Sequence, residues 1–137
     1  MPNVSVAAWL RLVRTYHKVD RSSVAHLRDW GLSFAQFDVL AHIGASEGLT
    51  QRELAEALLV TKGNVCQLLD RMEEAGLIVR RQDGRANHIF LTERGHRLFE
   101  EVVPAQENRI TEVFQALTSA EQHLLYGLLR KLDRALS

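Results

Sequence analysis

Arginine is concentrated in one short part of the sequence. Residues 80–97 contain five arginines against two carboxylates, whereas the whole chain has 17 basic and 17 acidic residues and a net charge of zero. Guanidinium groups bind phosphate through strong, charge-assisted hydrogen bonds. A segmented charge of this kind therefore permits a local phosphate-binding surface on a neutral protein.

Other kinds of site chemistry find no support in the sequence. The six histidines and the single cysteine, Cys66, do not follow the spacing of a zinc site or a metalloprotease helix. The chain also lacks a glycine-rich phosphate loop, a nucleophile–base pair and carboxylates at a useful spacing. We expect neither an enzyme nor a metal or cofactor site.

The basic segment lies in a predicted β-hairpin. Short β-rich runs at residues 77–79 and 89–91 flank a polar interval that contains Asp83-Gly84. Asp-Gly favours a tight turn because glycine accepts a positive φ without steric cost. The sequence therefore predicts a two-stranded hairpin at about residues 77–92, with a basic tip.

Two short helices are predicted just before this hairpin. Thr50 and Glu53 form a capping-box pattern that begins a helix over residues 51–58. Thr61 is the expected N-cap of the next helix, and Gly76 is placed to end it. Two helices joined by a turn of about three residues match a helix-turn-helix, and an ordinary helical hairpin is the alternative. The basic hairpin that follows favours a winged helix-turn-helix.

Long helices are predicted on both sides of this core. Apolar residues at helical spacing predict one helix over residues 4–29, and the leucine-rich C-terminal segment predicts another after Thr118. We interpret residues 4–30 and 93–137 as dimerisation helices around a winged core at 32–92, within a single domain of residues 1–137. An intramolecular bundle is the alternative. The predicted fold class is mainly α with a small β-hairpin wing.

An ordered set of motifs runs through this core. It comprises Leu49–Ala55, Val60-Thr61-Lys62, Leu69–Glu73, Gly76-Leu77-Ile78 and Asp83-Gly84-Arg85. In this order the motifs resemble the MarR family of winged-helix transcription regulators over nearly the whole chain. The resemblance implies a homodimer that binds a pseudo-palindromic operator in double-stranded DNA. It also implies a repressor that a small aromatic or lipophilic effector, or an oxidant, releases.

The resemblance assigns the DNA contacts to the second short helix, in the major groove, and to the wing. Asn and Gln suit adenine edges, and Lys and Arg suit guanine or phosphate. Arg85 matches the wing arginine that enters the minor groove, where a narrow groove favours arginine. Asp83 would orient the wing tip or serve only the turn. The expected DNA-binding residues are Gln51, Arg52, Thr61, Lys62, Asn64, Gln67, Arg71, Arg80, Arg81, Arg85 and Asn87.

One departure concerns the wing, and one concerns the cysteine. The interval between Arg80 and Asp83 is shorter than in many relatives, which implies a shallower reach into the minor groove. Cys66 suggests a redox-responsive regulator, but oxidant-sensing relatives carry their reactive cysteine in the first helix. A small residue that packs beside the groove is the alternative for Cys66.

An effector site is implied between the first two helices, where the family binds its ligands. His17, Trp30 and His42 would line it and hold an aromatic carboxylate, and half-buried side chains at helix edges are the alternative. No apolar run approaches the ~20 residues of a membrane span, and the N-terminus lacks the pattern of a signal peptide. We therefore expect a cytoplasmic protein without a membrane partner. A winged-helix protein-interaction module without specific DNA binding is the competing function.

Overall fold

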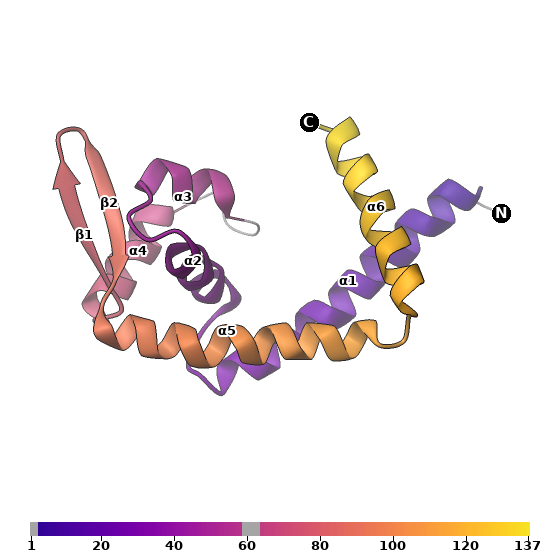
Figure 1. Cartoon of the computed structure of the whole chain (residues 1–137), viewed down its shortest axis with the longest axis horizontal. Helices are drawn as coiled ribbons and strands as arrows, with labels where there is room; N and C mark the ends of the chain where they lie inside the picture. Colours follow the sequence, from indigo (N-terminus) through magenta and orange to yellow (C-terminus); the bar gives the residue numbers. More distant parts are fainter. Residues whose placement is uncertain (1–2, 59–63) are drawn as a thin grey trace. The chain divides into compact units, whose positions relative to one another are not determined.

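The computed structural model describes residues 3–58 and 64–137. Within them, the chain forms six α-helices and one two-stranded β-hairpin (Figure 1), and the predicted fold class is confirmed. The elements are α1 (Val4–Arg28), α2 (Phe34–Ala45), α3 (Gln51–Ala57), α4 (Val65–Glu74), β1 (Ile78–Asp83), β2 (Ala86–Leu91), α5 (Glu93–Phe114) and α6 (Ser119–Ala135). Two compact units are present, Met1–Gln106 and Glu107–Ser137, and the boundary between them lies within α5.

Local capping signals explain where most helices begin. At the start of α3, the Thr50 hydroxyl accepts the Glu53 N–H at 3.1 Å, and the Thr50 N–H donates to Glu53 Oε1 at 2.9 Å. Ser33 and Thr118 form the same reciprocal pair at the starts of α2 and α6. Each capping box satisfies backbone N–H groups that have no intrahelical partner. The predicted capping box at Thr50 and Glu53 is therefore confirmed.

The helix after the turn begins at a different residue from the predicted one. The expected N-cap, Thr61, lies outside the described residues, as does Lys62. The observed N-cap is Asn64, in a left-handed conformation with φ 32° and ψ 38°, and its side chain makes no capping hydrogen bond. Asparagine adopts this region more readily than most residues. The Asn64 amide is thus not used in capping α4.

One aliphatic core joins the helix-turn-helix to the base of the hairpin. Leu27 of α1, Ile43 of α2, Leu54 of α3, Met72 of α4 and Ile89 of β2 are all fully buried. Each buried side chain of this size contributes roughly 1.5–3 kcal/mol to stability. The hairpin rises beside α3 and α4 in Figure 1, so the core that holds the two helices also holds the wing.

The hairpin turn is displaced by one residue from its predicted place. The antiparallel register pairs Ile78 with Leu91 and ends with Asp83 opposite Ala86. Gly84 and Arg85 are therefore the two turn residues, and Gly84 has φ 63°. Two-residue hairpin turns with glycine at the first central position need this positive φ. The register places Arg85 at the tip of the wing.

The second unit holds the end of α5 and all of α6. The side-chain amide of Gln122 donates to the carbonyl oxygens of Phe114 and Leu117 at 2.9 and 3.2 Å, which fixes the turn before α6. The leucines of α6 remain outside any core of the unit, since none of the α6 residues is buried. No helix in the described part of the chain is both long and apolar enough to cross a membrane.

Candidate nucleic-acid interface

An open hollow lies where α3 begins, α4 begins and the wing turns. Its volume is about 880 Å³. Two exposed arginines, Arg52 and Arg85, line it together with polar and small side chains, and no carboxylate is among its described lining residues. The lining residues are Thr50, Gln51, Arg52, Ala55, Asn64, Val65, Cys66, Arg85, Ala86 and Asn87. The hollow therefore presents hydrogen-bonding groups and two guanidinium groups, of which that of Arg52 also lies 3.6 Å from Glu56 Oε1.

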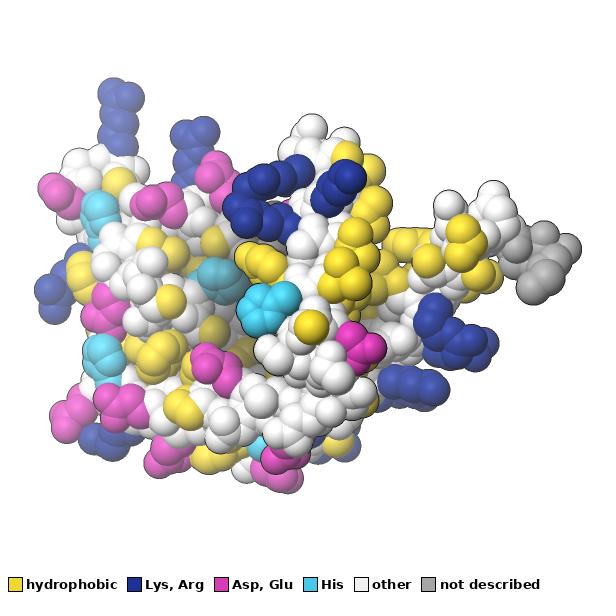
Figure 2. Space-filling model, turned by 45° about the vertical axis from the view of Figure 1, so that its right-hand side comes forward, with side chains coloured by type: hydrophobic (Ala, Val, Ile, Leu, Met, Phe, Trp, Pro, Cys, Tyr) yellow, Lys and Arg dark blue, Asp and Glu magenta, His cyan; other side chains and the backbone are white. Residues whose placement is uncertain are grey.

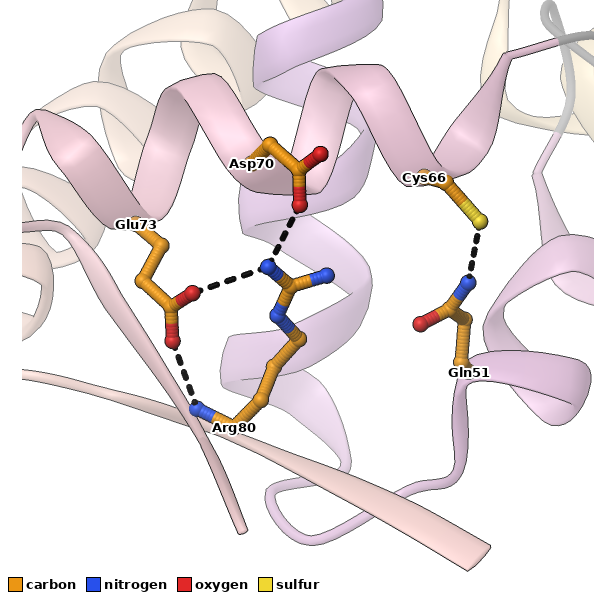
Figure 3. Close-up of polar contacts among 5 residues, drawn as sticks. All are labelled: Gln51, Cys66, Asp70, Glu73 and Arg80. Atoms are coloured by element: carbon orange, nitrogen blue, oxygen red, sulfur yellow. Dashed lines mark hydrogen bonds and ion pairs between the residues drawn. The ribbon is translucent and has the colours of Figure 1, made fainter. Parts of the chain in front are cut away.

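A side-chain contact links the starts of the two helices inside this hollow. Gln51 Nε2 donates to Cys66 Sγ at 2.8 Å (Figure 3). Gln51 is the first residue of α3, and Cys66 lies in the first turn of α4. The contact fixes the Gln51 amide against α4, and the thiol of Cys66 is exposed at the same place.

The wing is tied to the segment that precedes α3. The N–H of Gly48 donates to the Ile89 carbonyl at 2.8 Å, and the Ile89 N–H donates to the Leu49 carbonyl at 3.0 Å. The His88 ring bonds the Gly48 carbonyl through Nδ1 at 2.7 Å. These bonds fix β2 against the start of the helix-turn-helix, so the distance between the wing and α3 is set by backbone hydrogen bonding.

The other strand of the wing is tied to α4 through Arg80. Its Nη2 lies 2.6 Å from Asp70 Oδ1 and 2.8 Å from Glu73 Oε1. The Arg80 N–H also donates to Glu73 Oε2 at 3.3 Å. The hydrogen bond from Arg80 lowers the pKa of the Glu73 carboxyl below its ordinary value. Both Glu73 oxygens are thus engaged by β1.

The remaining predicted DNA-binding residues are distributed over two surfaces. Gln67 and Arg71 are exposed on α4, and Arg81 is exposed on β1 with its guanidinium 5.2 Å from the centre of the Phe90 ring. Of the expected set, Gln51, Arg52, Asn64, Arg85 and Asn87 meet at the hollow. Thr61 and Lys62 fall outside the described residues. Asp83 forms the last cross-strand pair before the turn, with Ala86, and is exposed.

The residues predicted for an effector site have different surroundings. His17 is exposed on α1 and its ring lies beside Tyr16, with the ring centres 5.7 Å apart. Trp30 packs against the core just after α1. His42 Nδ1 lies 3.2 Å from Asp38 Oδ1 and 2.8 Å from the Asp38 carbonyl. The Asp38 side chain is 6% exposed, so His42 holds a buried carboxylate.

Sequence reasoning missed the carboxylates that hold Arg80. Asp70 and Glu73 are three residues apart and therefore share one face of α4. Such a pair seven to ten residues before an arginine on a strand is the signal that indicates the contact. The role of His88 at the base of the wing was also not predicted, because its partner is a backbone carbonyl 40 residues away.

Comparison with known proteins gives consistent relatives. A family model described as the MarR family matches residues 30–86. An uncharacterized HTH-type transcriptional regulator of Bacillus cereus is 39% identical over 92% of this chain and 86% of its own length. The transcriptional repressor MprA of Escherichia coli is 32% identical over 77% of this chain and 63% of its own.

A solved structure of a protein–DNA complex is also similar. The Staphylococcus aureus MepR–DNA complex contains a chain with 25% identity and a TM-score of 0.80, over 94% of this chain and 96% of that one. The winged helix-turn-helix seen here thus has both sequence and structural counterparts among transcriptional regulators. This chain belongs to the MarR family of transcriptional regulators.

Proposed function

We propose that this protein binds a pseudo-palindromic operator in double-stranded DNA and acts there as a repressor. The observation that carries the proposal is the hollow in which α3, α4 and the wing tip meet. It brings Arg52 and Arg85 together without a carboxylate among the described lining residues. Asn64 and Gln67, three apart at the start of α4, offer amides for adenine edges. Such a regulator acts where bacterial chromosomal DNA lies, in the cytoplasm.

The test begins with selection of genomic fragments by the purified protein. Half-sites about one helical turn apart are expected, because each protomer would present one α4 to one major groove. Affinity for the selected duplex should fall steeply with salt, by roughly 0.9 log units per log unit of salt for each phosphate contacted. Binding without sequence selection, or without salt dependence, would contradict the proposal.

Arg85 offers the sharpest single substitution. Arg85→Ala is expected to weaken operator binding by more than about 1 kcal/mol, because it removes the arginine at the wing tip. The matched control is Arg97→Ala, which makes the same charge change at an exposed arginine of α5 that pairs with Glu93 at 3.1 Å. Equal affinities for the two variants in a gel-shift titration would defeat the assignment of Arg85.

We propose further that the working form is a homodimer. Large apolar side chains are exposed to solvent on α1 and on α6, including Trp9 at 61% and Leu128 at 53% exposure. Figure 2 shows exposed hydrophobic side chains, in yellow, among the charged ones. Monomeric proteins rarely leave extended apolar patches uncovered. A second copy of the chain is the partner that the proposed pseudo-palindromic operator requires.

Sedimentation velocity tests this part of the proposal. The wild type is expected to sediment as a dimer, and Leu128→Glu is expected to shift it to the monomer because a charge would be buried at the interface. Arg130→Glu, an exposed charge reversal on the same helix, should leave the dimer intact. A wild type that sediments as a monomer at working concentrations rules out the dimer.

A relative supports repression, and the side chains predicted for an effector site support its release. MprA is a repressor by name, and His17, Trp30 and His42 supply the aromatic and basic groups that would hold a small aromatic carboxylate. We propose that such an effector releases the DNA. A panel of benzoate-type acids added to the protein–operator complex tests this, and Trp30→Phe with His42→Gln should lose the response. Release that these variants leave unchanged places the effector elsewhere.

A protein-interaction module is the competing function, and the zero net charge of the chain favours it. The two functions separate in the salt titration above. An affinity for duplex DNA that does not change with salt would support the interaction module.

A further inference from the structure

Arg80 differs from the other arginines of the wing in the direction of its side chain. Successive residues of a strand point to opposite faces. Arg80 therefore shares a face with Ile78, which is 1% exposed in the core, while Arg81 points the other way and is exposed. The Arg80 side chain is only 18% exposed. Figure 3 shows its guanidinium between the carboxylates of Asp70 and Glu73 on α4.

We propose that Arg80 is a positioning residue that clamps the wing to the DNA-reading helix α4, and that its role in DNA binding is to set the position of Arg85. This inference rests on the proposed function. The side chain of Arg80 makes two short contacts to α4, and its backbone N–H makes a third. Because Glu73 holds both the backbone and the side chain of the same residue, the contact fixes the strand in position as well as in charge.

The contacts of Arg80 with α4 matter because β1 has few other attachments to the rest of the protein. A two-stranded hairpin is only marginally stable alone, so its attachments set its angle. β2 is held by the segment at residues 48–50. β1 is held by the buried Ile78 and then by Arg80, and its next residues, Arg81, Gln82 and Asp83, are exposed. Movement at Arg80 would therefore be carried to the turn that bears Arg85.

Charge argues against Arg80 as a phosphate ligand. Its single positive charge is balanced against two carboxylates, and the hydrogen bonds to Glu73 and then Asp70 raise the pKa of the guanidinium. A phosphate that approached this group would meet both carboxylates as well, and like charges repel. Arg81 and Arg85, by contrast, are exposed. Phosphate contact and clamping make opposite predictions for the carboxylates.

Four variants separate these two roles. Arg80→Gln removes the charge of the clamp, and Arg81→Gln, for comparison, removes one charge from the neighbouring, outward-facing residue. Glu73→Gln weakens the clamp from the α4 side. The exchanged pair Arg80→Glu with Glu73→Arg rebuilds the side-chain ion pair in reverse, without the backbone hydrogen bond that Glu73 accepts and with Asp70 still in place. Binding to the selected duplex is measured by fluorescence anisotropy over a range of salt, below the melting temperature of every variant.

The clamp predicts a specific pattern of affinities. Arg80→Gln should weaken binding roughly tenfold, the usual scale for a lost charge-assisted hydrogen bond, without changing the slope of affinity against salt. Glu73→Gln should also weaken binding, and the exchanged pair should recover part of the loss. A direct phosphate contact predicts otherwise. The slope would fall by about 0.9 for each arginine lost, Glu73→Gln would strengthen binding by removing repulsion, and the exchanged pair would recover nothing.

A readout without DNA completes the test. Amide exchange of the free protein should become faster at residues 81–87 in Arg80→Gln and slow again, toward the wild-type rate, in the exchanged pair. Unchanged exchange there would overturn the clamp, as would the phosphate-contact pattern of affinities. If the wild type fails to bind any duplex, the proposed function falls, and the exchange rates still decide whether Arg80 holds the wing.

Discussion

Gly95 sets how closely the first turn of α5 approaches the base of the wing. A Cβ at this position would overlap the carbonyl oxygen of Leu77, and would lie 3.1 Å from the Leu77 carbonyl carbon and 3.3 Å from Leu91 Cβ. The same carbonyl oxygen accepts the Thr92 N–H at 3.0 Å. Backbone cannot rotate aside as a long side chain does. Gly95→Ala must therefore push α5 away from the wing base.

The magnitude follows from three effects. Overpacking at a close-packed site costs about 1–3 kcal/mol, and a strained Thr92 hydrogen bond adds about 1 kcal/mol. Better helix propensity offsets about 1 kcal/mol at most. The net loss in the free energy of unfolding is about 1–3 kcal/mol. For a chain of this length, that loss lowers Tm by roughly 3–10 °C.

Thermal unfolding followed by circular dichroism measures the effect, at one protein concentration for all variants. Gly127→Ala is the control, because within the chain its Cβ would meet nothing within 4 Å. Its Tm should hold or rise. Gly44→Ala should lose less than Gly95→Ala, since its Cβ overlaps the Phe99 ring, which can move. Equal Tm values for Gly95→Ala and Gly127→Ala would refute the reasoning.

Three further predictions concern the ends of the helices. The left-handed conformation of residue 64, at φ 32°, penalises a Cβ. Asn64→Gly should therefore keep or raise the urea midpoint, and Asn64→Ala should lower the free energy of unfolding by about 1 kcal/mol. An Asn64→Ala variant as stable as Asn64→Gly contradicts this. Hydrogen bonds from the backbone N–H and the hydroxyl of Thr50 lower the pKa of Glu53, so this stabilisation is present above the pKa of the unfolded chain and is lost as the pH falls through the lower folded pKa. In thermal melts from about pH 6 to about pH 3, Glu53→Gln should lose less stability than the wild type. An equal loss in the two proteins would contradict a stabilising role for the Glu53 carboxylate. Alkylation of the exposed Cys66 with N-ethylmaleimide should block duplex binding because the adduct projects into the hollow that Cys66 lines. Cys66→Ser should resist the reagent. Full binding by the alkylated wild type would exclude Cys66 from the interface.

Much of the fold was predictable because its signals are local. The Thr50–Glu53 pair acts over three residues, so its presence in the sequence was enough to place the start of α3. The hairpin was predicted from Asp83-Gly84 for the same reason. The register of the hairpin was not predicted. Pairing between the strands decides it, and this pairing places the turn at Gly84-Arg85, one residue later than Asp83-Gly84.

The candidate site shows where sequence reasoning reaches its limit. The sequence by itself supplied the basic wing and its arginines, since charge and turn chemistry are properties of neighbouring residues. Only the tertiary structure distinguished Arg80 from Arg81. These neighbours are the same residue type, but strand alternation and the packing of β1 on α4 turn the first toward Asp70 and Glu73 and leave the second exposed. A side chain's role depends on which groups the fold brings to it, and those groups lie on another element.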